Sequence, residues 1–257
     1  FKVLRGHDWM PSTPIHLLVY KYLGFSIPEI GHLTDIMDPE GGKLSKRKGS
    51  TSARGLLSEG YLPETIFNFV ILLGWAPKDN RELFTLDEFV KAFDANGFQK
   101  SNPVFNREKL DWFNGHYIRE KSDEELIGLM KPYLKNFDDS TTKSVTYHRK
   151  IIPLIRDRIK KISDVKSFAG FFFEAPKVDV TLFGKNYKEH LEKAAEAIEK
   201  EVPLDQVPKD NGFKVGDFFM DLRIAITGSK FTPPINESML ILGKAETIER
   251  IKTALTL

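Results

Sequence analysis

The sequence predicts a mainly helical protein that opens with a short α/β unit of the nucleotide-binding, Rossmann-like kind. Two observations lead to this prediction. Residues 1–42 follow the order strand, helix, strand, which is typical of a parallel nucleotide-binding sheet. Residues 53–257 then consist of amphipathic helical segments with their own start and stop signals.

The composition agrees with a globular protein. The 257 residues can form two domains, and 41% of them are hydrophobic and 29% charged. No run of 18 apolar residues occurs, so no membrane-spanning helix is expected. The absence of cysteine excludes disulfides and thiolate metal sites and fits a reducing, cytoplasmic compartment. A net charge of +2 does not by itself indicate nucleic-acid binding, which would need local basic patches.

The α/β unit is expected to begin with a strand over residues 1–5. Ser12-Thr13-Pro14 then indicates a helix start, with a hydroxyl cap and a proline in the first turn. Residues 30–37 are expected to form the second strand. An apolar repeat at helical spacing lies between these strands: Ile15, Leu18, Val19 and Tyr22.

A basic loop follows the second strand. Residues 43–54 hold five Lys/Arg and no carboxylate, and the proline and two glycines before them favour a loop. Lys43 and Lys46, with small hydroxyl residues around them, suit a loop that folds over a polyphosphate during phosphoryl or nucleotidyl transfer. A solvated basic loop is the plain alternative. Ligands bind at the carboxyl ends of parallel strands, so residues 5–9 and this loop are expected at one edge.

The helical part has several clear boundaries. Thr85 and Glu88 form a capping-box pattern, and Ser122 caps a further helix after a domain boundary near residues 119–123. Further helices are expected over residues 185–200 and 213–226, and the last two helices meet at Gly243.

Residues 143–166 are basic, with eight Lys/Arg. A helical wheel places Arg158 at the edge of an apolar stripe, which predicts either an amphipathic surface helix or a helix that contacts phosphates and bases. Pro153 would start this helix or kink it. The stripe consists of five isoleucines: Ile151, Ile152, Ile155, Ile159 and Ile162.

Several blocks, in order, resemble glutamyl-tRNA synthetases of the bacterial type, which are class I aminoacyl-tRNA synthetases. Val3 to Pro14 is similar to the block before the KMSKS loop, and Lys43 to Arg47 resembles the Lys-Leu-Ser-Lys-Arg version of that signature. His7 departs from the family, which usually has an acidic residue there. The resemblance covers nearly the whole chain and continues through Glu59 to Glu64, Leu72 to Trp75, Lys109 to Trp112, Asn114 to Arg119, Leu222 to Gly228 and Leu242 to Lys244.

The resemblance implies a ligase that uses ATP, with Mg²⁺ in the parent enzyme, to form glutamyl-adenylate and then charges tRNA(Glu). Arg5 would pair with a carboxylate of glutamate, for which a guanidinium fork is suited. Arg158 and Arg223 would read anticodon bases. No metal ligands are expected in this chain. The residues implied for ATP are Asp8, Trp9, Thr13, Ile36, Lys43 and Lys46, with Lys43 and Lys46 also catalytic.

The resemblance also implies three domains. Residues 1–52 would end the catalytic domain, residues 53–120 would contact the tRNA stem, and residues 121–257 would bind the anticodon. Because the chain opens on Phe1 without a methionine, we expect a C-terminal portion that lacks the HIGH-motif half. Without that half the portion is expected to be inactive alone. We also expect a monomer.

Two alternatives stay open: a free-standing RNA-binding module without catalysis, and a nucleotide-binding domain unrelated to tRNA.

An all-helical C-terminal half distinguishes the chain from glutaminyl-tRNA synthetases, which carry β-barrels there. It also distinguishes the chain from the tRNA-modifying paralogue that charges a queuosine, which lacks an anticodon domain.

Overall fold

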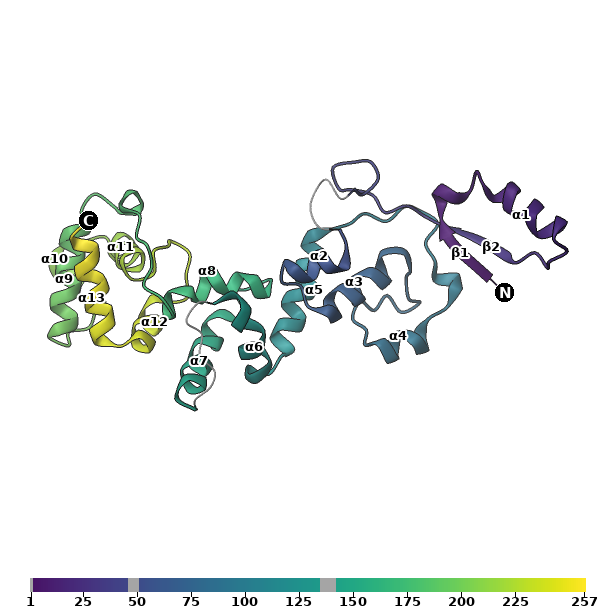
Figure 1. Cartoon of the computed structure of the whole chain (residues 1–257). Helices are drawn as coiled ribbons and strands as arrows, with labels where there is room; N and C mark the ends of the chain where they lie inside the picture. The colour runs from purple at the N-terminus through teal and green to yellow at the C-terminus, as the bar shows by residue number, and fades with distance from the viewer. Residues whose placement is uncertain (1, 46–50, 135–141) are drawn as a thin grey trace. The chain divides into compact units, whose positions relative to one another are not determined.

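The computed structural model describes residues 2–45, 51–134 and 142–257. The chain divides into two compact units, Phe1–Tyr117 and Ile118–Leu257. Helices dominate both (Figure 1). None of the helices in the described ranges is long and apolar enough to cross a membrane.

The first unit opens with the predicted strand–helix–strand order, which the structure confirms. β1 (Lys2–Gly6) and β2 (Glu29–Leu33) are parallel neighbours, connected by η1 (His7–Trp9) and α1 (Thr13–Tyr22) (Figure 1). β2 ends four residues earlier than predicted.

Helix α1 differs from the sequence prediction in its start. Ser12 has a helical backbone, and its hydroxyl donates to the Trp9 carbonyl at 3.0 Å instead of capping the helix. No residue of α1 is buried, so the expected apolar face is exposed. The exposed side chains of this face are Ile15, Leu18, Val19 and Tyr22.

The remainder of the first unit is helical and has its own core. The elements are α2 (Ala53–Ser58), α3 (Pro63–Gly74), α4 (Leu86–Ala92), η3 (Ala95–Gly97) and α5 (Arg107–Glu120), of which α5 continues past Tyr117. The predicted capping box between Thr85 and Glu88 is confirmed. The core includes Leu56, Tyr61, Ile66, Phe69, Leu73, Phe105, Leu110 and Phe113.

A buried amide fixes the start of α3 in this core. Asn114 has no exposed surface, and its Oδ1 accepts hydrogen bonds from the Leu62 backbone N–H and the Thr65 hydroxyl, each at 2.8 Å. Because buried donors without acceptors are costly, this one oxygen stabilises two groups at the start of α3, which lie 52 and 49 residues before it in the sequence.

The described part of the second unit contains helices and no strands. Its elements are α6 (Asp123–Met130), η4 (Lys131–Tyr133), α7 (Thr142–Ile155), η5 (Ile162–Asp164), α8 (Val165–Ala169), η6 (Gly170–Phe172), η7 (Val180–Leu182), α9 (Tyr187–Glu199), α10 (Val207–Asn211), α11 (Val215–Thr227), α12 (Ile235–Leu242) and α13 (Lys244–Leu255). A core formed largely by α9, α11 and α13 contains Leu191, Phe218, Leu222 and Ile251.

The prediction that a single helix carries the isoleucine stripe as far as Ile162 is wrong. Helix α7 ends at Ile155, and Pro153 lies in its last turn. The chain then turns, with the Arg158 N–H donating to the Ile155 carbonyl at 2.9 Å. All five isoleucines are nevertheless buried, because the turn and η5 return Ile159 and Ile162 to the same core.

Two buried features fix α11. His190 Nδ1 on α9 lies 2.7 Å from Asp221 Oδ2, and the other Asp221 oxygen accepts the Gly184 N–H at 2.8 Å. Gly228 caps α11 as predicted, with a left-handed φ of 71°. A Cβ at this position would lie 2.9 Å from the Pro176 Cβ and 3.1 Å from the Lys177 carbonyl oxygen, so the turn needs glycine for two reasons.

Candidate functional site

The guanidinium of Arg5 is held at the end of β1 by three neutral groups. Its Nε donates to His32 Nε2 at 3.1 Å, its Nη1 lies 2.8 Å from His16 Nδ1, and its Nη2 donates to the Thr13 hydroxyl at 2.6 Å. Arg5 is a direct register partner of His32 on β2, so the parallel pairing of the strands brings these two side chains together.

These contacts leave two N–H groups of Arg5 for a further partner. A guanidinium has five N–H groups, and one is used on each of its three nitrogens, so Nη1 and Nη2 each retain one. Within the described ranges no carboxylate forms an ion pair with Arg5. A positioned cation with two remaining donors suits bidentate binding of a carboxylate.

Lys43 joins the segments that follow the two strands. Its ammonium forms ion pairs with Asp8, directly after β1, and with Asp35, after β2, the latter at 3.0 Å. These two hydrogen bonds, that to Asp8 the larger cause, raise the pKa of Lys43 above its ordinary value. The ammonium is exposed and therefore remains accessible to an anion from solvent.

A tight hairpin aims Lys43 at this position. The Leu44 N–H donates to the Ile36 carbonyl at 2.8 Å, and Met37 and Lys43 form an antiparallel bridge. Gly41 and Gly42, at its tip, have φ values of 101° and 82°, which other residues rarely adopt. The loop prediction is thus correct for the described part, whereas Lys46 lies outside the described residues.

The other residues implied for ATP surround the same strand ends. Trp9 is 56% exposed and lies beside His16, with ring centroids 6.2 Å apart. The Thr13 hydroxyl contacts Arg5 and the Trp9 carbonyl, so in this structure it positions the arginine. Ile36 packs against the core of the first unit.

Sequence reasoning missed three residues of this site. Sequence alone gives His16 and His32 no role at this site, yet both accept hydrogen bonds from Arg5. Asp35 was not identified, although it pairs with Lys43. Its position two residues beyond the end of β2 was the available signal, since polar side chains after parallel strands line the ligand edge.

The second unit contains the two arginines predicted to read bases. Arg158 is exposed in the turn after α7. Arg223 lies on α11, and its Nε is buried without a hydrogen-bond partner among the described residues. A buried donor without an acceptor is rare in folded proteins.

No group of three His, Asp or Glu side chains that could hold a metal ion occurs in the described part of the chain.

Both units of the chain match known protein families. Residues 2–112 match the family "tRNA synthetases class I (E and Q), catalytic domain", and residues 125–255 match "Anticodon binding domain". The chain is 35% identical to a glutamate–tRNA ligase of Treponema denticola, across 98% of this chain and 58% of that protein. It is 38% identical to one from Borreliella burgdorferi, across 98% of this chain and 56% of that protein. The chain thus spans little more than half the length of these relatives.

A solved structure resembles the chain as well. A glutamate tRNA ligase from Elizabethkingia meningosepticum, described as a complex with its amino acid, superposes with a TM-score of 0.76 and 32% identity, covering 99% of this chain and 57% of that one. The chain therefore belongs to the class I tRNA synthetases of the glutamate and glutamine group, with the end of their catalytic domain followed by a helical anticodon-binding domain.

Proposed function

We propose that the protein that contains this chain activates glutamate with ATP and transfers it to tRNA(Glu). The observation that carries the proposal is the arrangement at the carboxyl ends of β1 and β2. There Arg5 offers two donors to a carboxylate, and Lys43 offers an exposed cation to phosphates.

Arg5 would orient the amino acid. Its two remaining N–H groups would bind a carboxylate of glutamate as a fork, while His16, His32 and Thr13 hold the guanidinium plane. Thr13, His16 and His32 carry no negative charge. They therefore do not compete with the substrate carboxylate for the guanidinium of Arg5.

Lys43 would stabilise the negative charge that grows on the departing pyrophosphate. Such a contact gains more in the transition state than in the ground state, and therefore accelerates the reaction. Lys46, which is outside the described residues, is proposed from the family resemblance to share this role. Mg²⁺ would arrive bound to the phosphates of ATP.

Other residues at the strand ends would bind the nucleoside. Asp8 uses Oδ2 for Lys43, which leaves Oδ1 for a ribose hydroxyl. Trp9 presents an exposed indole, and Thr13 and Ile36 would complete this part of the site. In the second unit, Arg158 and Arg223 would contact anticodon bases. Arg223 is half-buried on α11, and a planar guanidinium can stack on or hydrogen-bond to a splayed base.

The activation step is tested in the whole protein by glutamate-dependent exchange of pyrophosphate into ATP. Arg5→Lys keeps the charge but loses the fork, so we expect KM for glutamate to rise by about tenfold or more. Lys43→Ala should lower kcat by about a hundredfold, as for loss of a transition-state donor. Lys21→Ala on α1 is the control and should change neither. Exchange that is independent of glutamate, or unaffected by Arg5→Lys, would refute the proposal.

The recognition step is tested with this chain alone. It should bind tRNA(Glu) more tightly than a version with a swapped anticodon, and Arg223→Ala should remove about 1–3 kcal/mol of that preference. Lys188→Ala on α9 should leave the preference unchanged. Equal affinity for both RNAs with a steep salt dependence would instead indicate nonspecific phosphate contact, as expected of a simple RNA-binding module.

A further inference from the structure

The side chain of Asn102 links two segments of the first unit that lie far apart in the sequence. Its Oδ1 accepts the backbone N–H of Asp35, 67 positions away, at 3.2 Å, and its Nδ2 donates to the Met37 sulfur at 3.6 Å. Both of these residues contact Lys43. Asp35 forms an ion pair with its ammonium at 3.0 Å, and Met37 lies opposite it in the antiparallel bridge of the hairpin.

The backbone that follows Asn102 is paired with the same hairpin. The Met37 N–H donates to the Pro103 carbonyl at 2.8 Å, and the Phe105 N–H donates to the Met37 carbonyl at 2.9 Å. Phe105 is buried in the core of the first unit, so this pairing anchors the hairpin to that core. Pro103 restricts its own φ and the backbone of Asn102 before it, which keeps the segment extended.

Asp35 lies beyond the end of β2, in a stretch that is neither strand nor helix. Its N–H is therefore bonded by the side chain of Asn102 instead of by a neighbouring strand. The Asp35 side chain is 25% exposed, compared with 70% for Asp8, the other carboxylate beside Lys43. A shielded ion pair is screened less by salt, so the position of Asp35 helps to set where the ammonium of Lys43 lies.

We propose that Asn102 is a positioning residue for Lys43. The inference rests on the proposed function, in which Lys43 stabilises the departing pyrophosphate. Asn102 would hold Asp35 and Met37 so that the ammonium stays where negative charge develops, and a small displacement of such a group lowers the rate of the chemical step. The bond from Asp35 is exposed and contributes little to stability, so Asn102 acts on position and not on folding.

Asn102→Ala in the whole protein tests this role. We expect kcat of glutamate-dependent pyrophosphate exchange to fall about tenfold, the effect of losing one hydrogen bond. KM for glutamate and the melting temperature should stay unchanged, because the groups that hold Arg5 do not include Asn102. The matched control is Asn96→Ala, which removes an exposed amide that bonds to Asp94 within its own turn and should change none of these quantities.

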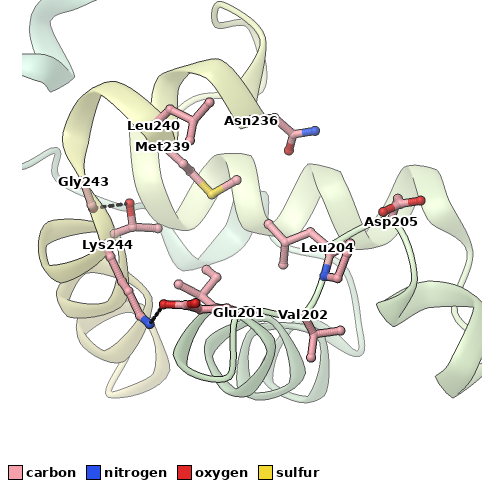
Figure 2. A pocket seen from close by; sticks show the side chains of 12 residues that line it. Glu201, Val202, Leu204, Asp205, Asn236, Met239, Leu240, Gly243 and Lys244 are labelled. Carbon is pink, nitrogen blue, oxygen red and sulfur yellow. Dashed lines mark hydrogen bonds and ion pairs between the residues drawn. The ribbon is translucent and has the colours of Figure 1, made fainter.

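The methionine methyl signals of this chain provide a readout that does not depend on activity. The chain has five methionines, which ¹³C-methyl-methionine labelling makes visible in NMR spectra. Asn102→Ala should shift the signal of Met37 and leave that of Met239 unchanged, because Met239 lines a cavity formed by α9, α12 and α13 of the second unit (Figure 2). Asn96→Ala should shift neither signal.

The titration of Lys43 measures the effect on the ammonium itself. The hydrogen bond to Asp35 is one of the two that raise the pKa of Lys43, so Asn102→Ala should lower this pKa, by less than Asp35→Asn does. If the wild-type protein shows no glutamate-dependent exchange, the proposed function fails, while a lower Lys43 pKa in Asn102→Ala still supports the positioning role. An active protein in which Asn102→Ala leaves both kcat and the Lys43 pKa unchanged would overturn the inference. A lower melting temperature with unchanged kcat would also overturn it, because it would show a purely structural role.

Discussion

Arg5 and His32 are register partners on two parallel strands, and the Arg5 Nε–H donates to His32 Nε2 at 3.1 Å. Since an arginine nitrogen can only donate, His32 must carry its ring proton on Nδ1, and by the same argument His16 must carry its proton on Nε2. The tautomers of two histidines are therefore fixed by one guanidinium.

This geometry predicts that His32 positions Arg5, the arginine proposed to bind glutamate. His32→Phe keeps a ring of similar size but removes the acceptor, so we expect KM for glutamate to rise about tenfold in the whole protein with kcat nearly unchanged. His32→Gln, which offers an amide oxygen, should recover part of the loss. A fall in kcat at constant KM would show that the arginine does not depend on this contact.

The pKa of Lys43 should fall when either of its carboxylate partners, Asp8 or Asp35, is removed. Its pKa is raised mainly by the hydrogen bond to Asp8, so Asp8→Asn should lower this pKa toward the ordinary 10.5. Because the folded-state pKa is the higher one, the stabilising contribution of the cluster is complete below about pH 10.5 and is lost as the pH rises through the folded value.

An alkaline NMR titration of the lysine side-chain signals measures this shift. Asp87→Asn, which removes an exposed carboxylate on α4, is the control and should leave the Lys43 titration unchanged. If Asp8→Asn had no effect on Lys43 either, the pair would not persist in solution.

The buried amide of Asn114 should be important for the stability of the first unit. Asn114→Ala leaves the Leu62 N–H and the Thr65 hydroxyl without an acceptor in the core, and we expect a loss of about 3 kcal/mol. Asn106→Ala removes only an exposed helix cap and should cost about 1 kcal/mol. All three tryptophans lie in the first unit, so fluorescence during urea unfolding reports on this unit. Equal losses for both variants would contradict the prediction.

The exposed apolar face of α1 predicts self-association of this chain at high concentration. Val19 is 50% exposed within that face, so Val19→Lys should raise the concentration at which light scattering detects association, without lowering the melting temperature. Ser101→Lys adds the same charge at an exposed polar site of the same unit and should have a smaller effect. Similar effects of both variants would assign the association to net charge instead.

The features that sequence predicted correctly are mostly local. The capping boxes at Thr85 and Ser122 and the glycine cap of α11 depend on residues within one or two turns, and all three form. The isoleucine stripe shows the limit of periodicity. The stripe correctly predicts that Ile159 and Ile162 are buried. It does not predict the backbone that buries them, because a turn can return residues to a core just as a helix can.

The arrangement of the candidate site depended on pairings that sequence does not display. The histidines beside Arg5 are 11 and 27 positions away, and only the parallel register brings His32 opposite the arginine. The pair of His190 and Asp221 likewise joins residues 31 positions apart. The hydroxyl of Ser12 was assigned to a cap, but the nearby Trp9 carbonyl is its acceptor instead.

Gly228 limits which substitutions the protein can accept at the end of α11. Its left-handed backbone disfavours any side chain, and the contacts with Pro176 and Lys177 leave no room for even a methyl group. Every missense change in its codon would therefore disturb the end of α11, five residues beyond Arg223. Natural variants of this chain should keep glycine here while the exposed residues around it drift.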